Sequence, residues 1–433
     1  MLQTLGQALK NADLRKRILF TILVFAVFKL MTFITVPLVD KDVLRRLFTN
    51  NNFNFGIFNV LTGNALENFS IIALGISPYI TASIVIQLLQ MDIIPILKEW
   101  SEEGETGRQK LNQLTRYVAL ALAFLQALVL SIGFDNFGGT LGSIFDVVDV
   151  KPIMYVYVAI VITAGTGILL WLSDQITLKG IGNGSSMIIV AGIISGVPYM
   201  MRDLLLTYTG SGTGIREWSI LTATIVMLIL VIVGVIYIQN ATRKVPIHYA
   251  NRPQSLPARR DSHLPIKLNP SGVIPVIFAT SLMSLPLVFS QFFKNPTAVQ
   301  WLNNIFNVRE PIGFVLMLIL IYAFSFFYAF VQVNPEKVAE NLKKQGSYIP
   351  GIRPGKETEN YLSGILMRTT VAGATFLAVV QALPIVLGWI IPSLPNSVQI
   401  GGTSLLIIVG VAQETYKQIE TQIQQRKYTG FIK

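Results

Sequence analysis

The sequence predicts an all-α membrane protein that crosses the bilayer ten times. Of its 433 residues, 52% are hydrophobic and only 13% are charged, whereas a soluble domain carries about 25% charged residues. The mean hydropathy is +0.57, and the apolar residues gather in segments of about 20, the length of a helix that spans the bilayer. This composition argues against a soluble globular enzyme.

Ten apolar segments are bounded by charged residues, Gly or Pro. They run approximately over 18–38, 71–91, 114–134, 152–172, 185–201, 218–238, 271–290, 311–331, 365–391 and 400–418. The first follows three basic residues, as a signal peptide would. It lacks a small-residue cleavage site and nine spans follow it, so we expect it to be retained as a helix.

The distribution of basic residues predicts the orientation of the chain. Of the 34 Lys and Arg residues, 24 lie at the termini, in the loops after even-numbered spans or in the span ends next to them, and eight lie in the opposite loops. Basic residues favour the cytoplasmic side of a membrane. We therefore expect both termini in the cytoplasm, and a basic cytoplasmic face that would attract anionic lipid, RNA or an acidic protein.

Several kinds of chemistry are missing from the sequence. It has no Cys and only two His, which leaves no thiolate or His-rich metal site. It has no GxxxxGK[ST], HExxH or GxSxG motif, and its spans contain almost no acidic residue or His to relay protons. We expect no catalytic residue, no metal and no cofactor, which argues against an enzyme, an ATP-driven pump and a proton-coupled carrier.

The stretch Phe53–Phe69 is apolar but too broken to cross the bilayer. Gly56, the turn pair Gly63-Asn64 and Glu67 interrupt it. Non-helical backbone at membrane depth survives only against protein or in a water-filled cavity. The stretch is therefore either re-entrant or an outer loop with a surface helix.

Glycines mark two features of the fifth span. The run Gly180, Gly182 and Gly184 predicts a tight turn into that span, capped by Asn183 or Ser185. Further along, Gly192 and Gly196 form a GxxxG pattern, which predicts close helix packing.

Two predicted cytoplasmic loops, 239–270 and 332–363, are longer than a connection requires. The first carries six basic residues against one acidic residue, and positive-inside topology alone could account for them. In the second, YIPGIRPG places Arg353 between two Pro-Gly pairs. Such pairs form turns, so we expect Arg353 at an exposed, stiff tip, suited to bidentate contact with carboxylate or phosphate.

Several long stretches resemble the SecY family, the channel subunits of the bacterial protein-translocation machinery. They are SIIALGISPYITASIVIQLL around the second span, WLSDQITLKGIGNGSSMI from Trp171, GVIPVIFATS in span seven, GIRPG in the second long loop and GGTSLLI in span ten. The resemblance covers essentially the whole chain. It implies two pseudo-symmetric five-helix halves, residues 1–205 and 206–433, around a central pore.

The resemblance also implies roles for particular residues. An aliphatic pore ring would comprise Ile76, Ile80, Ser185, Ile189, Ile277 and Ile407, with Ser185 departing from the bulky side chain expected there. A plug within about 53–69 would comprise Asn59, Val60, Leu61, Thr62, Gly63, Asn64, Ala65 and Leu66. A lateral gate towards lipid would comprise Thr81, Gln87 and Leu285.

Partners follow from the same resemblance. They are the small membrane subunits SecE and SecG, the motor ATPase SecA, the ribosome through its RNA phosphates, signal peptides and nascent chains, and membrane lipids. Arg243, Lys244 and Arg353 would contact the motor or the ribosome. The implied function is a passive channel in the bacterial cytoplasmic membrane that passes unfolded secretory polypeptides and releases hydrophobic segments sideways into lipid.

Two other classes compete with this interpretation. A secondary transporter would also have broken spans, but its midplane needs polar groups that these spans lack. An intramembrane enzyme would need a nucleophile paired with a base. Crosslinking of a hydrophobic export signal next to Thr81 or Leu285 would favour the channel, whereas saturable uptake of a small solute would favour the carrier.

Overall fold

The chain folds into a bundle of long helices, seen in a computed structural model that describes residues 10–39, 62–91, 93–138, 151–209, 214–249, 263–290, 296–391 and 396–429. Its principal helices are α2 (Ala12–Met31), α5 (Ser77–Leu89), α7 (Glu105–Gly138), α8 (Lys151–Lys179), α9 (Gly184–Thr209), α10 (Ile215–Asn240), α11 (Ile274–Phe289), α13 (Pro311–Gln332), α15 (Lys356–Ile390) and α16 (Asn396–Thr429). Each of the ten predicted spans overlaps one of these helices. In the described part of the chain, six helices are long and apolar enough to cross a membrane. The helices α5 and α11 are apolar but shorter.

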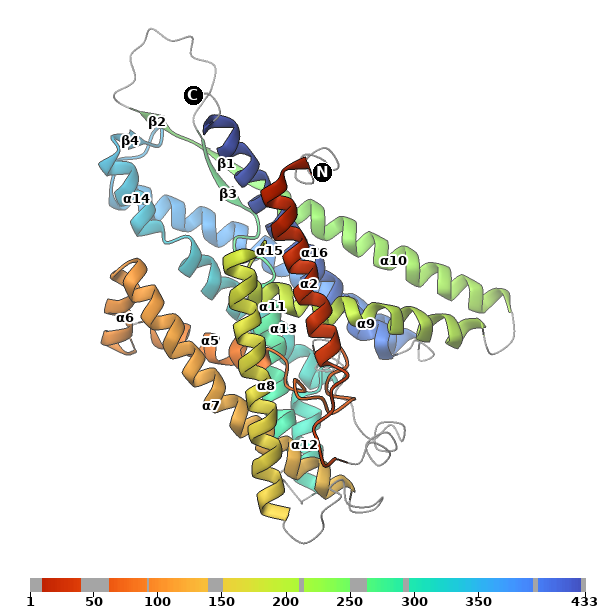
Figure 1. The fold of residues 1–433 in the computed structure, drawn as a ribbon. Coiled ribbons are helices and arrows are strands. Elements are labelled where there is room, and N and C mark those ends of the chain that lie inside the picture. Colours follow the sequence, from red (N-terminus) through yellow and green to blue (C-terminus); the bar gives the residue numbers. More distant parts are fainter. Residues whose placement is uncertain are drawn as a thin grey trace.

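The helices pack side by side, with the polar elements at one end (Figure 1). In the first part of the chain α7 packs on α5 and α8, and in the second part α15 packs on α13 and α16. The two parts meet where α5 touches α11 and where α9 touches α16. The predicted boundary between 205 and 206 lies inside α9, which continues to Thr209.

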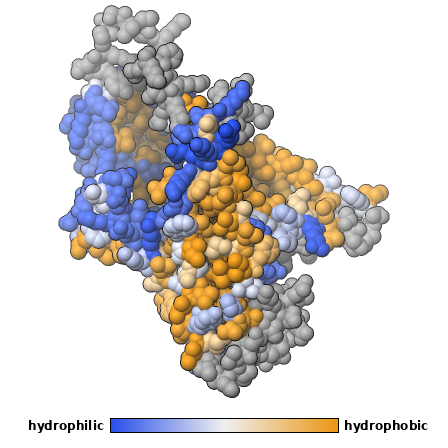
Figure 2. Space-filling model, in the orientation of Figure 1, coloured by the Kyte–Doolittle hydropathy of each residue, from blue (hydrophilic) through white to orange (hydrophobic). Residues whose placement is uncertain are grey.

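The surface separates by polarity along the bundle (Figure 2). Apolar side chains cover the long helices, and hydrophilic ones gather at the end that carries α6 (Pro95–Glu102), α14 (Pro335–Lys344) and the strands. Large apolar residues such as Ile229 and Leu230 are more than half exposed along these helices. An apolar band of this kind is the surface that a bilayer covers.

The second span is only partly helical, so the prediction of one helix over 71–91 was wrong at its start. Residues 62–76, which we call the turn segment, form turns, and α5 begins at Ser77. Gly75 adopts a φ of +57°, and Pro78 occupies the first turn of α5. A 13-residue helix rises only about 20 Å, so the turn segment supplies the remaining depth.

The turn segment is buried inside the bundle. Ala65, Leu66 and Phe69 are fully buried. Its backbone is bonded to the end of the first span, because the amide of Val36 donates to the Phe69 carbonyl at 3.0 Å, and the amide of Ile71 to the Ile34 carbonyl at 3.0 Å. Irregular backbone is stable at membrane depth only when protein satisfies it. This burial favours the re-entrant alternative for residues 62–69; residues 53–61 lie outside the described part.

The two long loops fold together instead of forming separate connections. β1 (Thr242–Pro246) pairs antiparallel with β3 (His263–Lys267), and β2 (His248–Tyr249) pairs with β4 (Ser347–Tyr348) from the second loop. We call these strands and α14 the polar unit. Its small core is a separate apolar cluster made of Val245, Ile247, Ile266, Leu342, Ile349, Leu362 and Ile365.

Candidate functional site

Five of the six residues assigned to the predicted ring belong to the same large buried apolar core. They come from α5 and the residue before it, and from α9, α11 and α16, and none is more than 6% exposed. We call them the isoleucine cluster: Ile76, Ile80, Ile189, Ile277 and Ile407. These side chains therefore face protein rather than lipid.

Local sequence explains how these side chains reach the cluster. Ile76 and Ile80 are four residues apart, and the Ile80 amide donates to the Ile76 carbonyl at 3.2 Å, so both lie on one face of the first turn of α5. Pro at the first turns of α5 and α11 sets the start of each helix, because Pro there needs no donor. Each helix thus begins close to the cluster.

Ser185 lies outside the isoleucine cluster. Its hydroxyl donates to Asn183 Oδ1 at 2.8 Å, and its amide donates to the same oxygen at 3.1 Å. Asn183 therefore caps the start of α9, which is one of the two caps expected there. Ser185 is a partly exposed part of that cap, one helical turn before Ile189.

The turn segment contributes to the same apolar core as the isoleucine cluster. Ala65 belongs to the same apolar core as those isoleucines. At Gly63 the backbone approaches α9 so closely that an added Cβ would lie 3.1 Å from Gly192 Cα and 3.4 Å from Phe28 Cε1. Gly192 thus admits the backbone of the turn segment. Of the eight predicted plug residues, 59–61 lie outside the described part.

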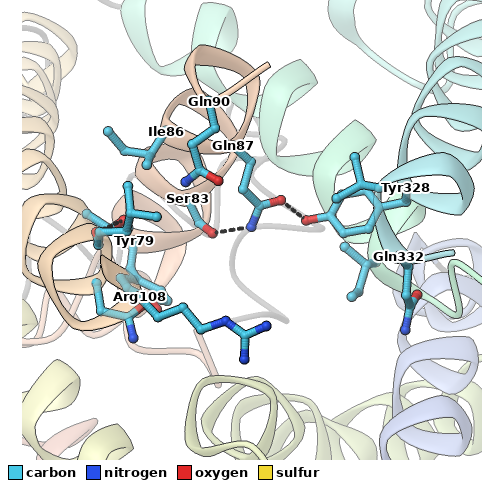
Figure 3. A pocket seen from close by; sticks show the side chains of 13 residues that line it. Tyr79, Ser83, Ile86, Gln87, Gln90, Arg108, Tyr328 and Gln332 are labelled. Carbon is cyan, nitrogen blue, oxygen red and sulfur yellow. Dashed lines mark hydrogen bonds between the residues drawn. The ribbon is translucent and has the colours of Figure 1, made fainter. Parts of the chain in front are cut away.

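A polar contact joins α5 to α13 (Figure 3). The Tyr328 hydroxyl donates to Gln87 Oε1, and Gln87 Nε2 donates to Ser83 Oγ at 3.0 Å. Thr81 is buried and donates to the Ser77 carbonyl at 3.2 Å. Leu285 lies half-buried on α11. Sequence reasoning found Gln87 but missed Tyr328, because Tyr322 and Ser325 also carry hydroxyls in the same span and nothing in the sequence singled out Tyr328.

A cavity of about 430 Å³ opens beside this contact, between α5, α7, α11 and α13. Most of the residues that line it have neutral polar side chains, and Arg108 is the charged residue among them (Figure 3). The polar side chains that line it are Tyr79, Ser83, Gln87, Gln90, Arg108, Asn112, Thr115, Tyr328 and Gln332. The cavity therefore brings polar groups to the boundary between α5 and α13.

The three predicted partner-binding residues belong to the polar unit or its edge. Arg243 and Lys244 are exposed on β1, and Arg353 is exposed in the loop between α14 and α15. Gly351 and Gly355 on either side of Arg353 have φ values of +78° and +110°. The Arg353 carbonyl accepts from Thr358 Oγ1 at 2.9 Å, which fixes the loop to α15. The expectation of an exposed, turn-bracketed tip is confirmed.

One acidic group in the polar unit already has a cationic partner. Lys344 donates to Glu340 Oε1 at 2.9 Å, one helical turn away on α14, and this hydrogen bond lowers the pKa of the Glu340 carboxyl. Glu340 therefore stays ionised and paired at neutral pH.

Comparison with known proteins decides the family. The family model described as SecY matches residues 70–416. The chain belongs to the SecY family. The protein translocase subunits SecY of Bacillus licheniformis and Bacillus subtilis are each 47% identical to it over 437 residues, with complete coverage of both chains. That of Staphylococcus aureus is 45% identical over 441 residues, covering 100% of this chain and 99% of the relative.

Solved structures share the SecY fold. The structure of a protein conducting channel matches with a TM-score of 0.62 at 19% identity, covering 94% of this chain and 92% of that one. Sec61 in the canine ribosome-channel complex from the endoplasmic reticulum matches with a TM-score of 0.61 at 18% identity and the same coverage. The SecY resemblance, the polytopic helical fold and the place in the bacterial cytoplasmic membrane are thus confirmed.

Proposed function

We propose that this SecY-family chain is a passive channel for unfolded secretory polypeptides, which also releases hydrophobic segments sideways into the membrane. One observation supports the proposal: isoleucines from four different helices lie in one buried apolar core, together with residues of an irregular buried segment. Membership of the family of translocase subunits indicates that the cargo is a polypeptide.

The isoleucine cluster has the chemistry of a seal. A narrow aliphatic constriction expels water and so blocks hydrated ions. It also offers neither a charge nor a hydrogen bond to which a moving peptide could attach. The same residues would therefore close the pore at rest and let a polypeptide slide through when they part.

Residues 62–66, the described part of the predicted plug, have the properties of a plug. Ala65 lies in the same apolar core as the isoleucines, Gly63 approaches α9, and these residues are not part of a helix. Such a segment can leave the pore without breaking a helix.

The contact between Tyr328 and Gln87 would hold the lateral gate. Thr81 and Gln87 lie on α5, Leu285 on α11 and Tyr328 on α13. Separating α5 from α13 breaks one hydrogen bond and exposes the polar cavity. A hydrophobic substrate segment would then enter lipid by its own transfer free energy, roughly −0.3 to −0.6 kcal/mol for each central Leu, Ile, Phe or Val.

The work of transport comes from partners in this proposal, since the sequence has no ATP-binding motif. A SecA-type motor or a ribosome would dock on the polar unit through Arg243, Lys244 and Arg353. SecE and SecG would cover part of the apolar belt. The chain itself would act on its cargo as a pore and not as an enzyme.

The proposal is tested by making the seal polar. In vesicles that contain the full chain, we expect Ile277→Asn to raise ion leak about tenfold, because burying an amide in the cluster costs about 1 to 3 kcal/mol and favours a wetted state. Ile277→Val should leave the leak near the unaltered level. If Ile277→Asn, Ile80→Asn and Ile407→Asn all remain as tight as the unaltered chain, the cluster is not the seal.

The gate contact gives a second expectation. Tyr328→Phe removes a hydrogen bond worth about 0.5 to 1.5 kcal/mol, so weakly hydrophobic signal segments should be exported about two- to tenfold faster. Strongly hydrophobic signals should be unaffected. Tyr322→Phe is the matched control, because the Tyr322 hydroxyl bonds Thr375 Oγ1 on α15, at 2.8 Å, and not α5. Equal effects of both variants would contradict a gate role.

A further inference from the structure

The short helix α12 (Pro296–Phe306) lies at the end of the molecule opposite the strands and both termini (Figure 1). It follows α11 and precedes α13, and it contacts both of them. None of its 11 residues carries a charge. The positive-inside pattern assigns this end of the bundle to the outer face of the membrane.

The helix α12 has one apolar face and one polar face. Its apolar residues Val299, Leu302 and Ile305 recur at helical spacing and are half-buried against the bundle. Asn303 is exposed on the side of the helix away from Trp301, because residues two positions apart lie about 200° from each other around an α-helix. Trp301 stands at the edge of the apolar face and is 66% exposed. The largest apolar side chain of α12 is therefore directed away from the protein.

The end of α12 is fixed to α13 and α15. A Cβ added at Gly313 would lie 2.1 Å from the Asn307 carbonyl oxygen, so the connecting turn is pressed on the first turn of α13. The Arg309 amide donates to Asn307 Oδ1 at 3.1 Å, and Trp389 Nε1 donates to the Arg309 carbonyl at 3.0 Å. The Trp389 ring also meets Phe314 edge to face, at 5.2 Å. The helices α12 and α13 therefore form one rigid corner.

The exposed side of α12 continues the apolar belt of its neighbours. On α13, Ile312 and Val315 are 60% and 53% exposed, and Phe289 is exposed at the end of α11. An uncharged helix with a Trp at its edge, beside a lipid-facing surface, has the chemistry of a helix lying in the headgroup region. A water-soluble partner would leave the adjoining belt uncovered.

From this geometry we propose that α12 is an interfacial helix, with Trp301 inserted at the boundary between headgroups and acyl chains of the outer leaflet. Its partner is the phospholipid surface. Because α12 is rigidly joined to α13, the outer end of that helix is held at a fixed depth in the membrane. This consequence for gating rests on the proposed function, whereas the lipid contact does not.

The absence of Cys from the chain permits a direct test. Trp301→Cys and Asn303→Cys each introduce one thiol, which is labelled with an environment-sensitive fluorophore in the full chain. The labelled chains are placed in vesicles of phosphatidylethanolamine and phosphatidylglycerol. We expect spin-labelled lipid to quench the label at position 301 at least about twofold more strongly than the label at 303. Iodide, a quencher dissolved in water, should quench the label at position 303 more strongly than the label at 301.

Two results would overturn the proposal. Strong iodide quenching at both positions would place Trp301 in water. Protection of position 301 from both quenchers would show that protein covers it. Neither result depends on export, so a failure of the proposed channel function would be seen separately, in the leak and export assays.

Discussion

Arg353→Glu is expected to abolish export driven by a motor or a ribosome while leaving the chain inserted in the membrane. The Arg353 side chain is exposed, and the positive φ values of Gly351 and Gly355 fix the loop that carries it. Losing a charge-assisted pair costs about 1.5 to 3 kcal/mol, and reversing the charge adds repulsion, so binding of the partner should weaken at least about 100-fold. Binding to the purified motor and export into vesicles measure the two effects.

Two further variants distinguish a requirement for the guanidinium group from a requirement for positive charge alone. Arg353→Lys keeps the charge but loses the bidentate geometry, so we expect an intermediate loss. Lys356→Glu reverses a charge three residues away, at the first residue of α15, where an acidic side chain is favourable. Equal damage from Lys356→Glu would mean that total charge matters, and normal export by Arg353→Glu would refute the docking role.

Gly165→Ala should displace the turn segment. A Cβ at this position of α8 would lie 1.9 Å from the Ile71 carbonyl oxygen and 2.7 Å from the Ile71 carbonyl carbon. Because these are backbone atoms, the turn segment must move. We expect a loss of about 1 to 3 kcal/mol in unfolding free energy, measured by thermal unfolding in detergent, and a raised ion leak in vesicles.

Gly167→Ala provides the matched control on the same helix. Its added Cβ would meet only the Leu120 side chain, at an ordinary 3.6 Å. Both substitutions raise helix propensity equally, so the difference between them isolates the contact with the turn segment. If the two variants unfold at the same temperature, the close approach of α8 to Ile71 does not stabilise the fold.

The sequence was informative where a single element determines its own structure. The ten apolar spans were located because lipid demands apolar length, and the exposure of Arg353 followed from two Pro-Gly turns. The start of the second span was wrong because residues 71–76 are as apolar as a helix, although Gly75 and Pro78 signalled a turn. Apolar composition alone does not distinguish buried irregular backbone from helix.

Features that depend on distant partners could not be predicted from local pattern. The strand pair between His248 and Tyr348 joins loops a hundred residues apart, and both strands are only two residues long. The contact from Tyr328 to Gln87 likewise links two spans far apart in sequence. The convergence of the isoleucines was expected from a family resemblance, since no periodicity within one helix indicates which helices meet.

The pairing of β2 with β4 has a mechanical consequence. It ties the connection between α10 and α11 to the connection between α13 and α15. A pull or push by a docked machine on either loop is therefore shared by both, and reaches α11 and α13 together. Load would reach α11 and α13 as one stroke, and α13 lies across the proposed lateral opening from α5.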